Sequence, residues 1–109
     1  MPFIKLEDIE QKEIVPGYKA RFIHSENMTI AHWNIKKGYS LPEHSHFHEQ
    51  LSCVTQGEFE LCIDGERRLL NSGNVAVIPA NAIHSGIAVT DCVIIDTFYP
   101  VREDYKNRK

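Results

Sequence analysis

The sequence has few cysteines, no long apolar run and no excess of basic charge, and each absence excludes a class of protein. Its 3 cysteines form an odd set without a CxxC pair, which indicates neither a disulfide framework nor a zinc ribbon. We expect Cys53, Cys62 and Cys92 to be small buried or half-buried side chains. No stretch approaches the roughly 20 apolar residues of a membrane span, and MPFIKLEDIE lacks the basic and apolar regions of a signal peptide. A cytoplasmic protein with no membrane segment is therefore expected.

The charge balance also argues against nucleic acid as a partner. The formal net charge is −3, and the basic residues are scattered apart from the terminal YKNRK, so no basic surface is predicted. The 109 residues, 42% hydrophobic and 25% charged, have an ordinary globular composition. Because a chain this short can bury one core but not two, we predict a single domain over residues 1–109.

The dominant hydrophobic period is two, in short runs rich in Val, Ile, Thr, Phe and Tyr, which indicates β-structure. Turn residues between the runs, at about ten-residue spacing, predict an all-β antiparallel sandwich or barrel. Asp64-Gly65 fits a two-residue type I′ hairpin, and only KLEDIEQKE has any helical character. The candidate strands are 18–23, 28–35, 50–55, 59–63, 66–70, 75–78, 84–89 and 93–98.

The stretch GYSLPEHSHFHEQLSCVTQG, residues 38–57, is rich in metal-ligating side chains. In a strand His44 and His46 would share a face, about 7 Å apart at the backbone, and His84, after the turn in IPANAIHSG, is a natural distant ligand. Imidazoles suit Zn, Fe, Ni, Cu and Mn in varying degree, and Gln50 could add an oxygen donor. His24 and His32 are expected to be structural residues.

These residues resemble the two motifs of the cupin family. Gly38, His44, His46, Gln50 and Gly57 match G-x5-H-x-H-x3(or 4)-E-x6-G, and Gly73, Pro79 and His84 match G-x5-P-x-G-x2-H-x3-N over residues 73–88. The resemblance implies a single cupin domain, that is, a double-stranded β-helix or jelly roll. It also implies a divalent metal ion (Ni, Zn, Mn or Fe) held by His44, His46, Gln50 and His84.

Three motif positions depart from the cupin pattern. Gln50 replaces the ligand glutamate, Asn81 a glycine and Ala88 the closing asparagine. Asn81 can replace glycine because asparagine tolerates left-handed backbone. A neutral Gln50 leaves the charge of a bound cation uncompensated, which predicts weaker metal binding and stronger Lewis acidity.

The last third of the chain contains a carboxylate in an apolar strand. In VIIDTFYPVREDY, Asp96 is in phase with Ile94 and Phe98 and therefore points inward on the barrel interpretation. One explanation is an ion pair with Arg102. The other is an acid/base group with a nearby anchor for a substrate carboxylate. Phe98 fits a cavity wall or a plain core position.

Four segments together resemble the small pectin-degradation cupins known as KdgF: IHSENMTIAHWNIKKG, LPEHSHFHEQ, IPANAIHSG and DTFYPVREDY. This resemblance implies ring opening of 4,5-unsaturated uronate monosaccharides, with an acidic sugar as substrate and with Asp96 and Arg102 as the catalytic pair. His48 is expected to support the metal ligands or the structure, and Glu49 either to do the same or to be a solvated charge. A sugar-binding cupin without activity and a metal-dependent dioxygenase are the alternatives. A homodimer is expected from the family and from the apolar start FIKL.

Overall fold

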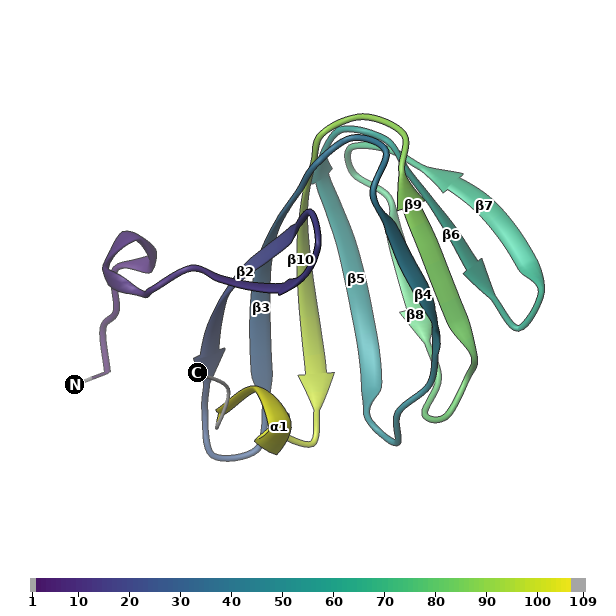
Figure 1. Ribbon diagram of the computed structural model, residues 1–109. Coiled ribbons are helices and arrows are strands. Elements are labelled where there is room, and N and C mark those ends of the chain that lie inside the picture. The colour runs from purple at the N-terminus through teal and green to yellow at the C-terminus, as the bar shows by residue number, and fades with distance from the viewer. Residues whose placement is uncertain (1, 107–109) are drawn as a thin grey trace.

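The computed structural model describes residues 2–106, and most of its regular structure is β-strand (Figure 1). The helical elements are a 3-10 turn at Leu6–Asp8 and a short helix, α1, at Glu103–Lys106. The strands are β1 Lys12–Val15, β2 Tyr18–His24, β3 Thr29–Ile35, β4 Ser40–His44, β5 Glu49–Gln56, β6 Phe59–Ile63, β7 Glu66–Leu70, β8 Val75–Ile78, β9 His84–Ala88 and β10 Cys92–Tyr99.

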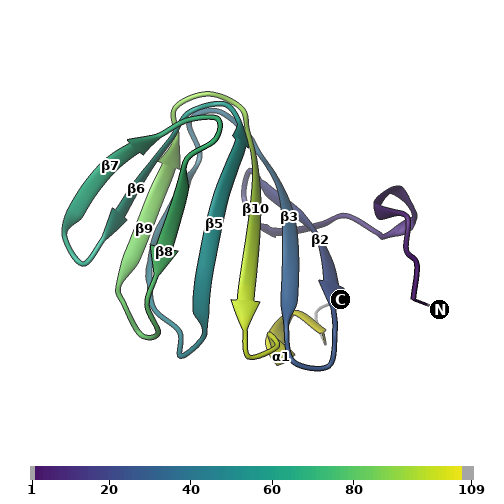
Figure 2. The same ribbon diagram turned by 180° about the vertical axis from the view of Figure 1, so that it is seen from behind.

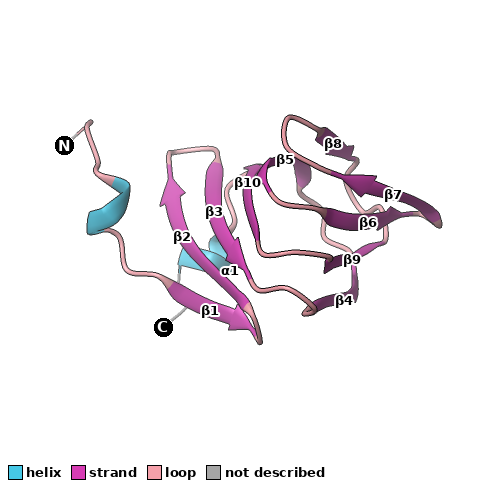
Figure 3. Cartoon of the chain, turned by 90° about the horizontal axis from the view of Figure 1, so that it is seen from above, coloured by secondary structure: helices cyan, strands magenta, loops and turns pink. Residues whose placement is uncertain are grey.

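The strands form two antiparallel sheets. One has the order β1-β2-β3-β10-β5-β8 and the other the order β4-β9-β6-β7, and the two can be followed from behind in Figure 2 and from above in Figure 3. Some neighbours are distant in sequence, as β3 and β10 or β4 and β9 are, because the chain crosses repeatedly between the two sheets from β3 to β10. This is the jelly roll that the cupin resemblance implied, so the predicted fold class is confirmed.

Alternation along the strands decides which side chains face the interior. Residues 92, 94, 96 and 98 of β10 are buried, as are residues 50, 52 and 54 of β5. In the antiparallel register of β10 with β5, Asp96 lies opposite Ser52 and Phe98 lies opposite Gln50. Polar inward residues from two strands therefore become direct cross-strand neighbours inside an otherwise apolar core.

Two turn predictions are confirmed by the backbone angles. Asp64 and Gly65 have φ of 47° and 87°, which is the positive pair that a type I′ loop needs. Asn81 has φ of 68°, so it does occupy the left-handed conformation that glycine would adopt there. The cysteines are free and at least partly buried, as predicted.

Three sequence-based expectations need correction. Strands β1 and β4 were not predicted. Strand β4 contains Pro42 and few apolar residues, so it shows no alternation of apolar and polar residues. The helical part of KLEDIEQKE is limited to the turn Leu6–Asp8, and its last two residues begin β1. Helix α1 was not predicted, because one helical turn has no periodic signal. His44 ends β4 whereas His46 lies in the connection to β5, so these histidines do not share one strand face.

No helix within residues 2–106 is long and apolar enough to cross a membrane. The expected homodimer stays a prediction. Phe3 and Ile4, at the apolar start of the chain, are 87% and 58% exposed.

Candidate metal centre and active site

Three histidines converge although they come from separate segments. Strand β4 pairs with β9 so that His44 lies opposite His84, and the connection after β4 returns His46 to the same place. The ring centroids of His44 and His84 are 4.1 Å apart, and those of His46 and His84 are 5.0 Å apart. One ring nitrogen from each histidine lies within 4.8 Å of the other two, which is the spacing that ligands of a single ion require.

Main-chain carbonyls fix the tautomer of each ring. Every Nδ1 of this trio is hydrogen-bonded to a backbone oxygen, and because a carbonyl can only accept, each Nδ1 carries the proton and each Nε2 keeps its lone pair. The acceptors are the carbonyl oxygens of Pro42 at 2.8 Å from His44, His48 at 3.1 Å from His46 and Ala82 at 2.9 Å from His84. Metal-binding histidines are oriented in this way.

The environment of these rings favours the neutral form. Burial lowers the pKa of His46 to about 4, with smaller contributions from the charges of Arg102, His84 and His44. Burial also lowers the pKa of His84, and its Nε2 is a buried atom without a hydrogen-bond partner in the described structure. Neutral imidazoles with converging lone pairs fit a divalent transition metal ion.

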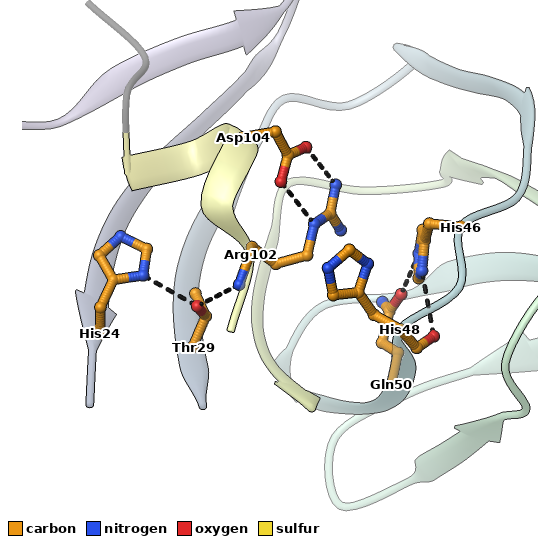
Figure 4. Close-up of polar contacts among 7 residues, drawn as sticks. All are labelled: His24, Thr29, His46, His48, Gln50, Arg102 and Asp104. Atoms are coloured by element: carbon orange, nitrogen blue, oxygen red, sulfur yellow. Dashed lines mark hydrogen bonds and ion pairs between the residues drawn. The ribbon is translucent and has the colours of Figure 1, made fainter. Parts of the chain in front are cut away.

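Gln50 presents its oxygen to this cluster. Its Oε1 is 3.1 Å from His46 Nε2, as Figure 4 shows. Since the proton of His46 is on Nδ1, these two facing atoms are both acceptors, and a bound cation would satisfy both. The Gln50 side chain is buried, and its Nε2 donates to Ser52 Oγ at 3.0 Å. Gln50 thus fits the role of fourth donor.

Asp96 is a buried carboxylate that forms no ion pair with any residue of the described range 2–106. It accepts a hydrogen bond from the hydroxyl of Ser52, and its side chain faces the same cavity as the three histidines. Burial raises the pKa of Asp96 from 3.8 to about 6, although Ser52, Gln50 and Trp33 pull it down. Among residues 2–106 no ion pair joins Asp96 to Arg102, because Arg102 pairs with Asp104. An ion pair with Arg102 therefore does not explain the inward position of Asp96. An unpaired carboxylate with a pKa near neutrality suits proton transfer.

Several contacts hold Arg102 in the cavity that the three histidines also line. Its Nε and Nη2 donate to the two carboxylate oxygens of Asp104 at 3.0 and 2.8 Å (Figure 4). Its guanidinium lies over the rings of Phe98 and Tyr105, 4.7 and 4.0 Å from their centroids. The backbone N–H of Arg102 donates to Thr29 Oγ1. Arg102 lines the cavity, and its Nη1 takes no part in the pair with Asp104.

The other predicted site residues lie around the histidine cluster and do not face it as ligands. His48 is buried, stacks on Phe47 with 4.0 Å between centroids, and orients His46 through its own carbonyl. Phe98 is 2% exposed and lies edge-on to His46 at 5.7 Å, so it is both a core residue and a cavity wall. Glu49 is exposed, which favours the solvated charge. 

Sequence reasoning missed three residues of this site. Asp104 and Tyr105 hold the guanidinium of Arg102, and Ser52 hydrogen-bonds both Gln50 and Asp96. Asp104 stands in the quoted VREDY, and its distance of two residues from Arg102 was a usable signal. No sequence signal pointed to Ser52, because only the strand register brings it opposite Asp96.

The geometry defines a jelly roll with a histidine centre, and comparison with known proteins agrees with this class. The sequence pattern of the Cupin domain family matches residues 31–98. The chain therefore belongs to the cupin family.

Among individual proteins, the chain is similar to the pectin degradation protein KdgF of Dickeya dadantii (strain 3937). They are 32% identical over 97 residues, which cover 86% of this chain and 88% of that protein. The structure of KdgF from Halomonas sp. has a TM-score of 0.90 at 28% identity, covering 96% of this chain and 98% of that one. An RmlC-like cupin from Shewanella frigidimarina NCIMB 400 has a TM-score of 0.91 at 30% identity and 96% coverage of both chains.

Proposed function

We propose that this cupin accelerates the opening of 4,5-unsaturated uronate monosaccharides to their linear keto form. The observation that carries the proposal is the buried, unpaired carboxylate of Asp96, which shares one cavity with the histidine cluster and with Arg102. The similarity to pectin degradation protein KdgF over most of both chains supports an acidic sugar as the substrate.

The reaction is an isomerisation that needs two proton movements and no oxidant. A base removes the proton of the anomeric hydroxyl, C1=O forms, the bond from C1 to the ring oxygen breaks, and its electron pair leaves an enolate at C5. A proton then adds to C4, the C4=C5 bond is lost, and C5 becomes a ketone. One group that accepts the first proton and returns it at C4 balances the reaction.

Asp96 is the group that we assign to both proton transfers. Its pKa of about 6 leaves it ionised at neutral pH yet able to hold a proton during turnover. The hydroxyl of Ser52 fixes one of its oxygens, so the carboxylate stays oriented between the two events.

Arg102 is the group that we assign to the C6 carboxylate of the substrate. Because Asp104 engages Nε and Nη2, the substrate would bind on the Nη1 side of the guanidinium. The stacking on Phe98 and Tyr105 fixes the plane of the guanidinium before the substrate arrives. A divalent metal held by His44, His46, His84 and Gln50 would polarise a substrate oxygen when bound.

The test is to mix the metal-loaded protein with unsaturated monouronate released by a pectate or alginate lyase and to follow the ultraviolet absorbance of its C4=C5 bond. Acceleration over the spontaneous rate supports the isomerase. A protein that binds the sugar in calorimetry but leaves the absorbance decay unchanged would be a sugar-binding cupin. Oxygen consumption would instead indicate a dioxygenase.

A further inference from the structure

Three buried side chains form a hydrogen-bonded chain that ends at the histidine cluster. Gln50 Nε2 donates to Ser52 Oγ at 3.0 Å, and Ser52 Oγ–H donates to Asp96 Oδ1. The exposed fractions are 6% for Gln50 and 7% for both Ser52 and Asp96. We propose that Ser52 is a positioning residue that holds the amide of Gln50 with its oxygen toward the metal. The inference rests on the metal centre of the proposed function.

The protons available on these groups decide which atom donates in each of the two hydrogen bonds. A serine hydroxyl has one proton, and a carboxylate can only accept, so the proton of Ser52 is committed to Asp96. Ser52 Oγ can then act toward Gln50 only as an acceptor, through its lone pairs, so the atom that faces it must be a donor. Gln50 must therefore turn its Nε2 toward Ser52, which leaves Oε1 facing His46 Nε2.

Without acceptors on the side of Ser52 and Asp96, the opposite orientation of the Gln50 amide would be preferred in the metal-free protein. The Nε2 of His46 has a lone pair, because its Nδ1 carries the proton that binds the carbonyl of His48. An amide rotated by half a turn would donate its N–H to that lone pair. The same rotation would place a donor where a cation needs an oxygen. Ser52 thus disfavours the one local arrangement that competes with metal binding.

Gln50→Glu separates positioning from packing. The two oxygens of a carboxylate are equivalent, so a glutamate at position 50 needs no neighbour to select between them. Removing the hydroxyl of Ser52 should therefore weaken metal binding when residue 50 is glutamine and much less when it is glutamate. A general loosening of strand β5 would weaken binding equally in both backgrounds.

The experiment is a Ni²⁺ titration against a fluorescent chelator, carried out on the parent, Ser52→Ala, Gln50→Glu and the double variant. We expect Ser52→Ala to lower Ni²⁺ affinity about 10-fold or more, the usual cost of losing a partner of a metal ligand. In the Gln50→Glu background most of this loss should disappear. Thr55→Ala is the matched control, since Thr55 Oγ1 lies on the same strand and donates to Val93 O, away from the site.

Each outcome decides one question. If the parent binds Ni²⁺ and Ser52→Ala binds it equally well, or if the loss is equal in both backgrounds, the positioning role is wrong and the metal centre stands. If the parent does not bind Ni²⁺, the metal centre and the inference fail together. Should Ser52→Ala not fold, Ser52→Cys keeps a side chain of similar size with a weaker donor, and its affinity should fall in the same background-dependent way.

Discussion

Replacing Asp96 by asparagine should make the metal-free protein more stable at neutral pH while removing its activity. The structure buries this carboxylate without a direct ion pair in the described part of the chain, and burial raises its pKa from 3.8 to about 6. A folded-state pKa above the unfolded value means that the folded protein holds the proton more tightly. Stability therefore falls as the pH rises from about 4 to about 6, and the accumulated loss is about 3 kcal/mol.

The assay is urea unfolding of metal-free parent and Asp96→Asn protein between pH 4 and pH 8. The parent should lose stability across that window and the variant should not, so that at pH 8 the variant is more stable by up to about 3 kcal/mol. Turnover of the unsaturated uronate should fall about 100-fold or more if Asp96 transfers the protons.

Asp104→Asn is a control that should change the stability at pH 8 in the opposite direction. Its hydrogen bonds with Arg102 lower the pKa of Asp104, so the stability it contributes is present above the unfolded pKa and is lost as the pH falls through the folded one. Asp104→Asn should therefore be less stable than the parent at pH 8. An Asp96→Asn protein that is also less stable than the parent at pH 8 would refute the assignment of Asp96 as an uncompensated buried charge.

Three further predictions concern the metal and the substrate anchor. His44→Ala combined with His84→Ala should abolish bound metal in elemental analysis of desalted protein, and full retention would place the site elsewhere. Gln50→Glu should tighten metal binding in a competition titration and slow turnover, because it adds a negative charge beside the cation; unchanged affinity would mean that Gln50 is not a ligand. Arg102→Lys should raise KM more than it lowers kcat in steady-state kinetics, since lysine keeps the charge but loses the planar fork and the stacking. An unchanged KM would remove Arg102 from substrate binding.

Local patterns predicted most of the fold and the histidine cluster. Period-two runs located the central strands, and the positive φ of Asp64 and Asn81 followed from turn chemistry. The convergence of His44, His46 and His84 was correct, but the reason given for it was wrong, because His46 leaves the strand.

Non-local geometry accounts for the features that the sequence did not reveal. Strand β4 has too few apolar residues for its period to be seen. Ser52 meets Asp96 only through the pairing of β5 with β10, which joins residues 44 positions apart. Arg102 pairs with Asp104 and not with Asp96 because the chain turns into α1 after β10. Register and chain direction at such points depend on the whole sheet.

We propose that this cupin opens an unsaturated uronate ring by means of Asp96. The most direct measurement is the absorbance decay of the C4=C5 bond of lyase-derived monouronate in the presence of metal-loaded parent and metal-loaded Asp96→Asn protein. We expect rapid decay with the parent and decay reduced about 100-fold or more with the variant. Decay at the spontaneous rate with the parent, or equal decay with both proteins, would contradict it.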